Sequence, residues 1–123
     1  MADIVRWEPQ SAWLVFAAGE MGRVSFDGPL TRICTAPGEV LELGGAGGTG
    51  IDQSDAWVFF DLDGAGLAAI VPVDLDPAGF GIGSAAATVA AHISVLLWRR
   101  AGGFTIGCRR SYADSFAAVL ASV

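Results

Sequence analysis

Along this 123-residue chain, short apolar runs rich in strand-forming residues alternate with turns rich in Gly, Asp and Pro. The most continuous run, Ala56–Phe60, is bounded by Asp and Gly residues and predicts a strand. Ala65–Val71 predicts one or two helical turns, which end at Pro72 because proline lacks the backbone N–H. Two further runs, His92–Trp98 and Phe104–Cys108, predict a pair of strands joined by a hairpin turn.

The N-terminal half shows weaker patterns. The apolar runs 3–7 and 12–17 flank Glu8-Pro9-Gln10-Ser11, which predicts a hairpin. Leu30, Ile33 and Cys34 have the i, i+3, i+4 spacing of one helical face, so a short helix is expected there. The remaining expected elements are a strand at Arg23–Phe26, an alternating strand at Glu39–Leu43 and a Gly-rich loop at Gly44–Gly50.

The last element has the clearest helical pattern. Ser111 is a favourable N-cap, with Asp114 three residues later as a weak capping box. Tyr112, Phe116 and Leu120 then fall on one face by helical spacing. The order strand, short helix, two hairpin strands, long helix predicts an α+β fold with a ferredoxin-like antiparallel sheet and helices on one face. We expect one domain over residues 1–123, in which residues 1–50 contain the hairpin, the short helix and the Gly-rich loop. Residues 51–123 contain the other elements named above and the closer of the family matches given below.

Composition narrows the possible partners. The chain is 53% apolar and 16% charged, so part of its surface is poorly solvated, which favours a covering partner. The net charge is −6 and no Lys is present, which disfavours nucleic-acid binding. Cys34 and Cys108 lie far apart with a single His in the chain, so we interpret them as structural thiols and expect no metal site.

One segment raises the question of a membrane span. Pro77–Trp98 carries no formal charge and precedes Arg99-Arg100, as an anchored helix does. Several Gly, Ser and Thr residues and His92 dilute its hydrophobicity, so two strands of a soluble domain are the preferred interpretation. The N-terminus lacks the apolar core of a signal peptide, and we expect a cytoplasmic protein.

Two short motifs suggest chemistry at first sight. Gly45–Gly50 matches G-x-G-x-x-G, but Ile51–Gln53 leads into a strand instead of a helix, and Asp52 and Asp55 would repel a phosphate. We therefore interpret it as a loop. His92 is the single histidine, and a lone histidine among small apolar residues is usually a core or interface residue. A Ser–His–Asp triad through it stays an alternative, although the sequence lacks the nucleophile elbow G-x-S-x-G.

The run VFFDLDG, ending at Asp61, Asp63 and Gly64, resembles the first motif of haloacid-dehalogenase-type phosphatases. In that family the first Asp attacks phosphorus, the second is the acid/base, and Mg²⁺ offsets the charge. Here Ala65-Gly66 replaces the expected residues after the glycine, no Lys is available for the phosphate, and the following strands read as antiparallel. A small Mg²⁺ phosphatase that uses Asp61 and Asp63 remains the alternative function, and two solvated carboxylates at a strand end are the preferred interpretation.

A broader resemblance covers about the last 60% of the chain. The stretches IDQSDAWVFFDLDG, VPVDLDPAGFGIGSAAATVAAHISVLLWRR and FTIGCRRSYADSFAAVL are similar to the gamma subunit of heterotetrameric, tetrahydrofolate-dependent sarcosine oxidase. The N-terminal EPQSAWL also looks like a short loop ahead of a strand in that family, whereas residues 18–50 match loosely. The matching positions are Asp52, Ser54, Pro72, Asp74, Leu75, Phe80, Gly83, Ser84, His92, Leu96, Leu97, Arg110, Ser111, Tyr112 and Ala113.

The resemblance implies a fold related to the folate-binding trunk of aminomethyltransferases. It implies a non-catalytic accessory subunit of a flavin-dependent sarcosine or N-methyl amine oxidase complex that passes a one-carbon unit to tetrahydrofolate. FAD, FMN, NAD and tetrahydrofolate are then expected in the larger flavoprotein subunits, and no catalytic, cofactor-binding or metal-binding residue is expected in this chain. The family's N-terminal segment looks shortened here. The further alternative is a stand-alone module of the same fold that binds folate or another small ligand, or a homo-oligomer of that fold.

Overall fold

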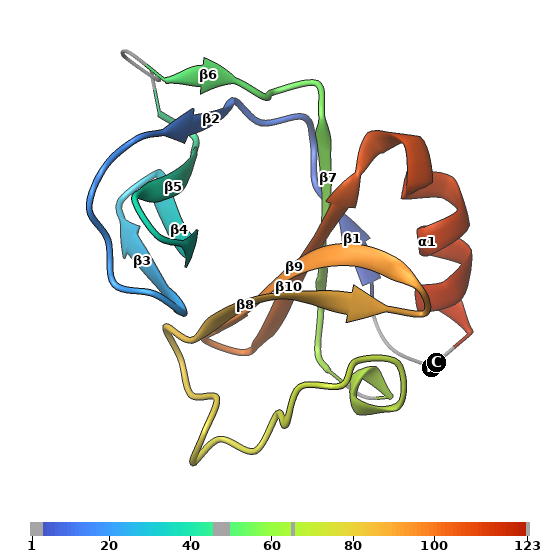
Figure 1. Cartoon of the computed structure of the whole chain (residues 1–123). Coiled ribbons are helices and arrows are strands. Elements are labelled where there is room, and N and C mark those ends of the chain that lie inside the picture. The colour runs from blue at the N-terminus through green and yellow to red at the C-terminus, as the bar shows by residue number, and fades with distance from the viewer. Residues whose placement is uncertain (1–3, 46–49, 65, 123) are drawn as a thin grey trace.

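Two five-stranded antiparallel sheets and a C-terminal helix make up a computed structural model that describes residues 4–45, 50–64 and 66–122 (Figure 1). Sheet A has the strand order β1-β7-β10-β9-β8, and sheet B has the order β3-β4-β5-β2-β6. The chain therefore starts in sheet A, builds sheet B, and returns to sheet A for its second half.

Sheet A is built around β7, whose sequence WVFFDL is apolar on both faces. Such a run suits a central strand, since both of its faces are covered. β10 pairs with β7 so that Ile106 lies opposite Phe60, and β1 pairs with the other edge so that Arg6 also lies opposite Phe60. The strands of sheet A are β1 (Ile4–Arg6), β7 (Trp57–Leu62), β8 (Ala85–Ala90), β9 (Ile93–Arg100) and β10 (Gly103–Arg109).

Sheet B contains most of the N-terminal half. Gly28 and Gly38 have positive φ in the tight turns before and after β4, a backbone conformation that glycine adopts at little cost. A loop crosses its outer face so closely that Gly19 packs against Cys34 and Val40. The strands of sheet B are β2 (Ala12–Val15), β3 (Arg23–Asp27), β4 (Leu30–Ala36), β5 (Glu39–Leu43) and β6 (Ile51–Asp52).

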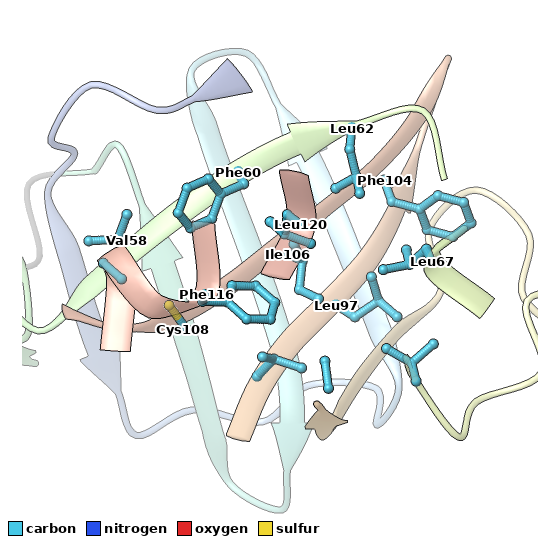
Figure 2. Close-up of a cluster of buried hydrophobic side chains, with 14 of the residues drawn as sticks. Val58, Phe60, Leu62, Leu67, Leu97, Phe104, Ile106, Cys108, Phe116 and Leu120 are labelled. Atoms are coloured by element: carbon cyan, nitrogen blue, oxygen red, sulfur yellow. The ribbon is translucent and has the colours of Figure 1, made fainter. Parts of the chain in front are cut away.

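Two hydrophobic clusters give the molecule three layers. The first lies between sheet A and the helix α1 (Ala113–Ala121), where Phe116 and Leu120 are fully buried and Phe116 meets Phe60 at a ring-centroid distance of 6.0 Å (Figure 2). The second lies between the two sheets and joins Phe59 and Trp98 of sheet A to Ile33 and other residues of sheet B. Figure 1 accordingly shows α1 on one side of sheet A and sheet B on the other.

An arginine fixes the long connection between β7 and β8. After the 3-10 turn η1 (Leu67–Ala69), the chain runs irregularly to β8, and Arg99 donates to the carbonyls of Leu75 (2.7 Å) and Phe80. The Arg99 guanidinium also lies 4.4 Å from the ring centroid of Phe104. These contacts attach the connection to sheet A, and Phe80 of the connection packs into the first hydrophobic cluster.

The α+β class with antiparallel pairing is confirmed, and so are the predicted strands around β5, β7, β9 and β10. Sheet B as a separate layer was not predicted, and whether 1–123 is one domain stays a prediction. The segment Pro77–Trp98 is loop and strand, as preferred; within residues 4–45, 50–64 and 66–122, no helix combines the length and hydrophobicity of a membrane span. Of the predicted loop Gly44–Gly50, positions 46–49 lie outside the described residues.

Three local predictions were wrong. The expected helix at Leu30–Cys34 is strand β4, because Ile33 and Cys34 are buried on opposite faces of sheet B. The expected N-terminal hairpin does not form, since β1 pairs with β7 and β2 pairs with β5 and β6. Ser111 is not the N-cap: it lies in the 3-10 turn η2 (Arg110–Tyr112), and α1 begins after Tyr112 without a side-chain cap hydrogen bond.

Candidate functional site

Asp61, the predicted nucleophile of the phosphatase alternative, belongs to a polar cluster on sheet A. Its carboxylate accepts a 2.6 Å hydrogen bond from the Thr105 hydroxyl on β10 and lies 3.4 Å from Nε of Arg100. Thr105 is fully buried, while the side chains of Asp61 and Arg100 are each 30% exposed. The cluster thus satisfies a buried hydroxyl and neutralises a half-buried carboxylate, which is a structural task.

The surroundings of Asp61 and Asp63 also differ from those of the phosphatase motif. Both neighbours of β7 run antiparallel to it, whereas the motif opens a parallel sheet. Asp63 is exposed just beyond the end of β7. No group of three or more His, Cys, Asp or Glu side chains is gathered in a metal-binding arrangement within the described parts of the chain. The structure therefore offers no support for phosphoryl transfer at these carboxylates.

Asp52 and Ser54, two positions of the family resemblance, hold the start of the connection between the two sheets against β2 of sheet B. Ser54 Oγ accepts from the backbone amide of Ala12 (3.0 Å) and donates to Asp52 Oδ1 (2.6 Å). The Ser54 amide donates to the same carboxylate oxygen (2.9 Å), and these two hydrogen bonds lower the pKa of Asp52. Gln53 adds a backbone hydrogen bond to Ala12 (2.7 Å). The D-x-S sequence is thus a clamp where the chain leaves sheet B for β7.

His92, the two cysteines and Arg110 were also singled out in the sequence. His92 is exposed in the two-residue turn between β8 and β9. Cys34 and Cys108 are buried free thiols, and burial raises the pKa of Cys108 to about 11. Arg110 donates through Nε to the carbonyl of Asp55 (2.8 Å), so it holds the turn before β7.

A site that the sequence did not reveal lies at the start of β7. Trp57 and Arg109 are register partners on β7 and β10, and the Arg109 guanidinium lies 4.1 Å from the Trp57 ring centroid. Trp57 Nε1 donates to Gln53 Oε1 (3.0 Å), and its ring stacks with Phe59 at 5.9 Å. We call this pair, with Gln53, the Trp57 platform. The residues are far apart in sequence, so only the strand register could have predicted the pair.

Hollows surround the Trp57 platform. One of about 230 Å³ opens between the two sheets, with an apolar floor that includes Ile33 and Leu96 and a rim that includes Glu39 and Arg109. A second, of about 360 Å³, runs along β8 and β9 past Val89. Trp and Arg held rigidly above apolar surface are enriched at the centres of protein interfaces. The arrangement is suited to contact with another molecule.

Comparison with known proteins confirms the resemblance found in the sequence. No family model matches the chain. The chain is 37% identical over 102 residues to the sarcosine oxidase subunit gamma of Arthrobacter sp., a match that covers 74% of this chain and 50% of the relative. The chain therefore spans about half the length of this curated relative.

The fold also matches a solved structure. The heterotetrameric sarcosine oxidase from Corynebacterium sp. U-96, in complex with pyrrole 2-carboxylate, contains a chain that superimposes with a TM-score of 0.77. The superposition covers 92% of this chain and 78% of that chain, at 21% sequence identity. The two chains share a fold.

Proposed function

We propose that this chain, which is similar in sequence to the sarcosine oxidase gamma subunit, is a non-catalytic accessory subunit of a flavin-dependent sarcosine or N-methyl amine oxidase complex. The observation that carries the proposal is the 37% identity over 102 residues to a subunit of that name. The clamp at Asp52 and Ser54 supports the non-catalytic part of the proposal, because these two residues of the resemblance make structural hydrogen bonds in this chain.

The exposed apolar side chains are consistent with a subunit that is partly covered by a partner. Large apolar side chains are exposed at several places, including Phe16 (63%), Ile82 (62%) and Met21 (53%). Obligate assemblies bury apolar side chains of this kind against a partner. We place the partners among larger flavoprotein subunits, and we place FAD, FMN, NAD and tetrahydrofolate binding in those subunits.

Recovery of the native complex tests this proposal. A chromosomally tagged chain, purified from its own host, is expected to bring down larger subunits whose absorption spectrum is that of a bound flavin. The same tag on an unrelated protein of that host is the control. A chain recovered alone and free of flavin absorption, from cells that oxidise sarcosine, would contradict the proposal.

A second measurement separates an accessory role from a catalytic one. The Asp61→Asn variant, compared with an Asp63→Asn variant, should keep full sarcosine-dependent peroxide production in the complex if it still assembles. The isolated wild-type chain should give no heat of binding with tetrahydrofolate. Turnover of a phosphatase substrate that depends on Asp61, or folate binding by the isolated chain, favours one of the alternatives instead.

A further inference from the structure

The outer edge of β8 carries backbone groups that point away from sheet A. The amide of Ala85 donates to the carbonyl of Gly22 (2.8 Å), and the amide of Ala91 donates to the carbonyl of Ile70 (3.2 Å). The Ala85 bond is directed away from β9, the strand that pairs with β8, and Ala91 lies just beyond β8 in the turn to β9. In a β-strand, alternate residues direct their N–H and C=O groups to the same side. Ala87 and Val89 therefore also direct their N–H and C=O groups outward.

These outward groups form an open edge between two closed ends. Among the backbone hydrogen bonds of the described residues, none uses the amide of Ala87 or Val89 as a donor to another strand or loop on this side. Ala87 is exposed and Val89 is 45% exposed, so no bulky side chain covers them. The contacts of Ala85 and Ala91 limit the open edge to the strand residues between them, roughly 15 Å at the usual rise per residue.

The other edge strands of both sheets are protected by charge. β1 ends in Arg6, β3 contains Arg23 and Asp27, and β6 contains Asp52. Charged side chains on edge strands discourage pairing with another chain. β8, with the sequence AAATVA, has no charged residue and no proline. Of the four edge strands in the described structure, β8 alone lacks this protection.

We propose that an extended segment of a partner subunit pairs with β8 and adds a strand to sheet A. This inference rests on the proposed function, which supplies the partner. The occupant follows from the edge itself, because a row of alternating amide and carbonyl groups is complemented by a polypeptide in extended conformation. The hollow of about 360 Å³ beside Val89, lined also by Trp57 and Leu96, accepts an apolar side chain of the added strand.

Amide exchange in the wild-type protein tests the pairing directly. In the isolated chain the outward amides of Ala87 and Val89 should exchange fast, whereas the inward amides of Ala86 and Thr88, directed at β9, should exchange slowly. In the purified complex the exchange of Ala87 and Val89 should slow at least tenfold. Unchanged exchange of both amides in an intact complex overturns the inference and leaves the proposed function standing.

Paired variants give an independent readout. Val89→Lys places a charge on the open edge, and Val5→Lys makes the same change on β1, at the opposite edge of sheet A, where the side chain is 61% exposed. Val89→Lys should lower recovery of the partner subunits at least fivefold, with the melting temperature of the isolated chain unchanged, whereas Val5→Lys should not. Equal recovery with both variants contradicts the inference.

The remaining outcomes are also distinguishable. If the wild-type chain brings down no partner subunit, the proposed function fails and the inference fails with it. If sedimentation shows that the isolated chain is a dimer in which Ala87 and Val89 are protected, the occupant is a second copy, which also overturns the inference.

Discussion

The hydroxyl oxygen of Ser54 accepts a hydrogen bond from the backbone amide of Ala12 across 42 sequence positions, at 3.0 Å. Ala12 is the first residue of β2 and is 1% exposed, so its amide has no access to water. Ser54 lies in the turn that carries the chain from β6 of sheet B to β7 of sheet A. One side chain thus attaches the turn that leads to sheet A to the first residue of β2.

Removal of this hydroxyl should destabilise the fold. Ser54→Ala leaves the buried Ala12 amide without an acceptor, which costs about 1–2 kcal/mol of unfolding free energy. Urea unfolding monitored by tryptophan fluorescence measures the loss. Ser25→Ala, at an exposed position of β3, is the matched control and should change stability by less than about 0.5 kcal/mol. Equal stabilities for the two variants would show that the clamp is unimportant.

Asp52 should make the clamp sensitive to acid. Its pKa in the folded state is lowered from 3.8, first by the Ser54 hydroxyl and then by the Ser54 amide. A lowered folded pKa contributes stability that is present above pH 3.8 and is lost as the pH falls through the folded value. The stability difference between wild type and Asp52→Asn should therefore shrink below pH 3.8. Urea midpoints from pH 7 to pH 2 test this, with Asp55→Asn as control; a constant difference contradicts it.

A glycine of β10 should be intolerant of any side chain. A methyl group at Gly107 would overlap the ring of Phe59, which is 4% exposed and packed between the two sheets. Gly107→Ala should cost about 1–3 kcal/mol through overpacking. Gly79→Ala is the control, because a methyl group there meets nothing within 4 Å. Thermal unfolding of both variants is the measurement. An unchanged melting temperature for Gly107→Ala would contradict the close contact between Gly107 and the Phe59 ring.

Substitutions in the turn between β8 and β9 should increase the stability of the fold. Ala91 and His92 have φ of 49° and 70°, the left-handed region that both positions of a type I′ hairpin turn require. Non-glycine residues pay for this conformation, so Ala91→Asn with His92→Gly should raise stability by about 1 kcal/mol. Ala101→Asn, in the next hairpin turn and without positive φ, should give no gain. Calorimetry measures the unfolding free energy of both variants, and an equal increase in both would contradict the turn assignment.

Cys108 should be chemically silent in the folded protein. Burial raises its pKa from 9.0 to about 11, so near pH 8 its thiolate fraction is about 100-fold below that of an ordinary cysteine. A Cys34→Ala variant isolates Cys108, whose reaction with a chromogenic disulfide should be at least 100-fold slower in the native state than in guanidinium. Fast native labelling would mean that α1 opens readily from sheet A.

Sequence patterns were sufficient where one local signal dominated. The run around Phe59 and the strand before Arg99 were predicted because central strands read as continuous apolar segments. Leu30–Cys34 was misassigned because its helical spacing and the strand propensity of Thr31, Ile33 and Thr35 compete, and burial on both faces of β4 decided in favour of the strand.

The candidate site was harder to predict than the fold. Trp57 and Arg109 meet because of strand register, and the open edge of β8 depends on which neighbours Ala85 and Ala91 reach. Neither relationship is encoded within a short window of sequence. The Asp52-x-Ser54 pair was singled out by resemblance, but its use as a clamp required the position of Ala12.

The pairing of β1 with β7 has a consequence for how the chain is made. Ile4 leaves the ribosome long before its partner Leu62, and at roughly 5–20 residues per second the delay is several seconds. During that time sheet B can assemble, apart from β6, because its other strands lie within the first 43 residues. Sheet A cannot be completed until Arg109 has been synthesised, so the nascent chain keeps the apolar strand β7 without its partner β10 after most of sheet B has been made.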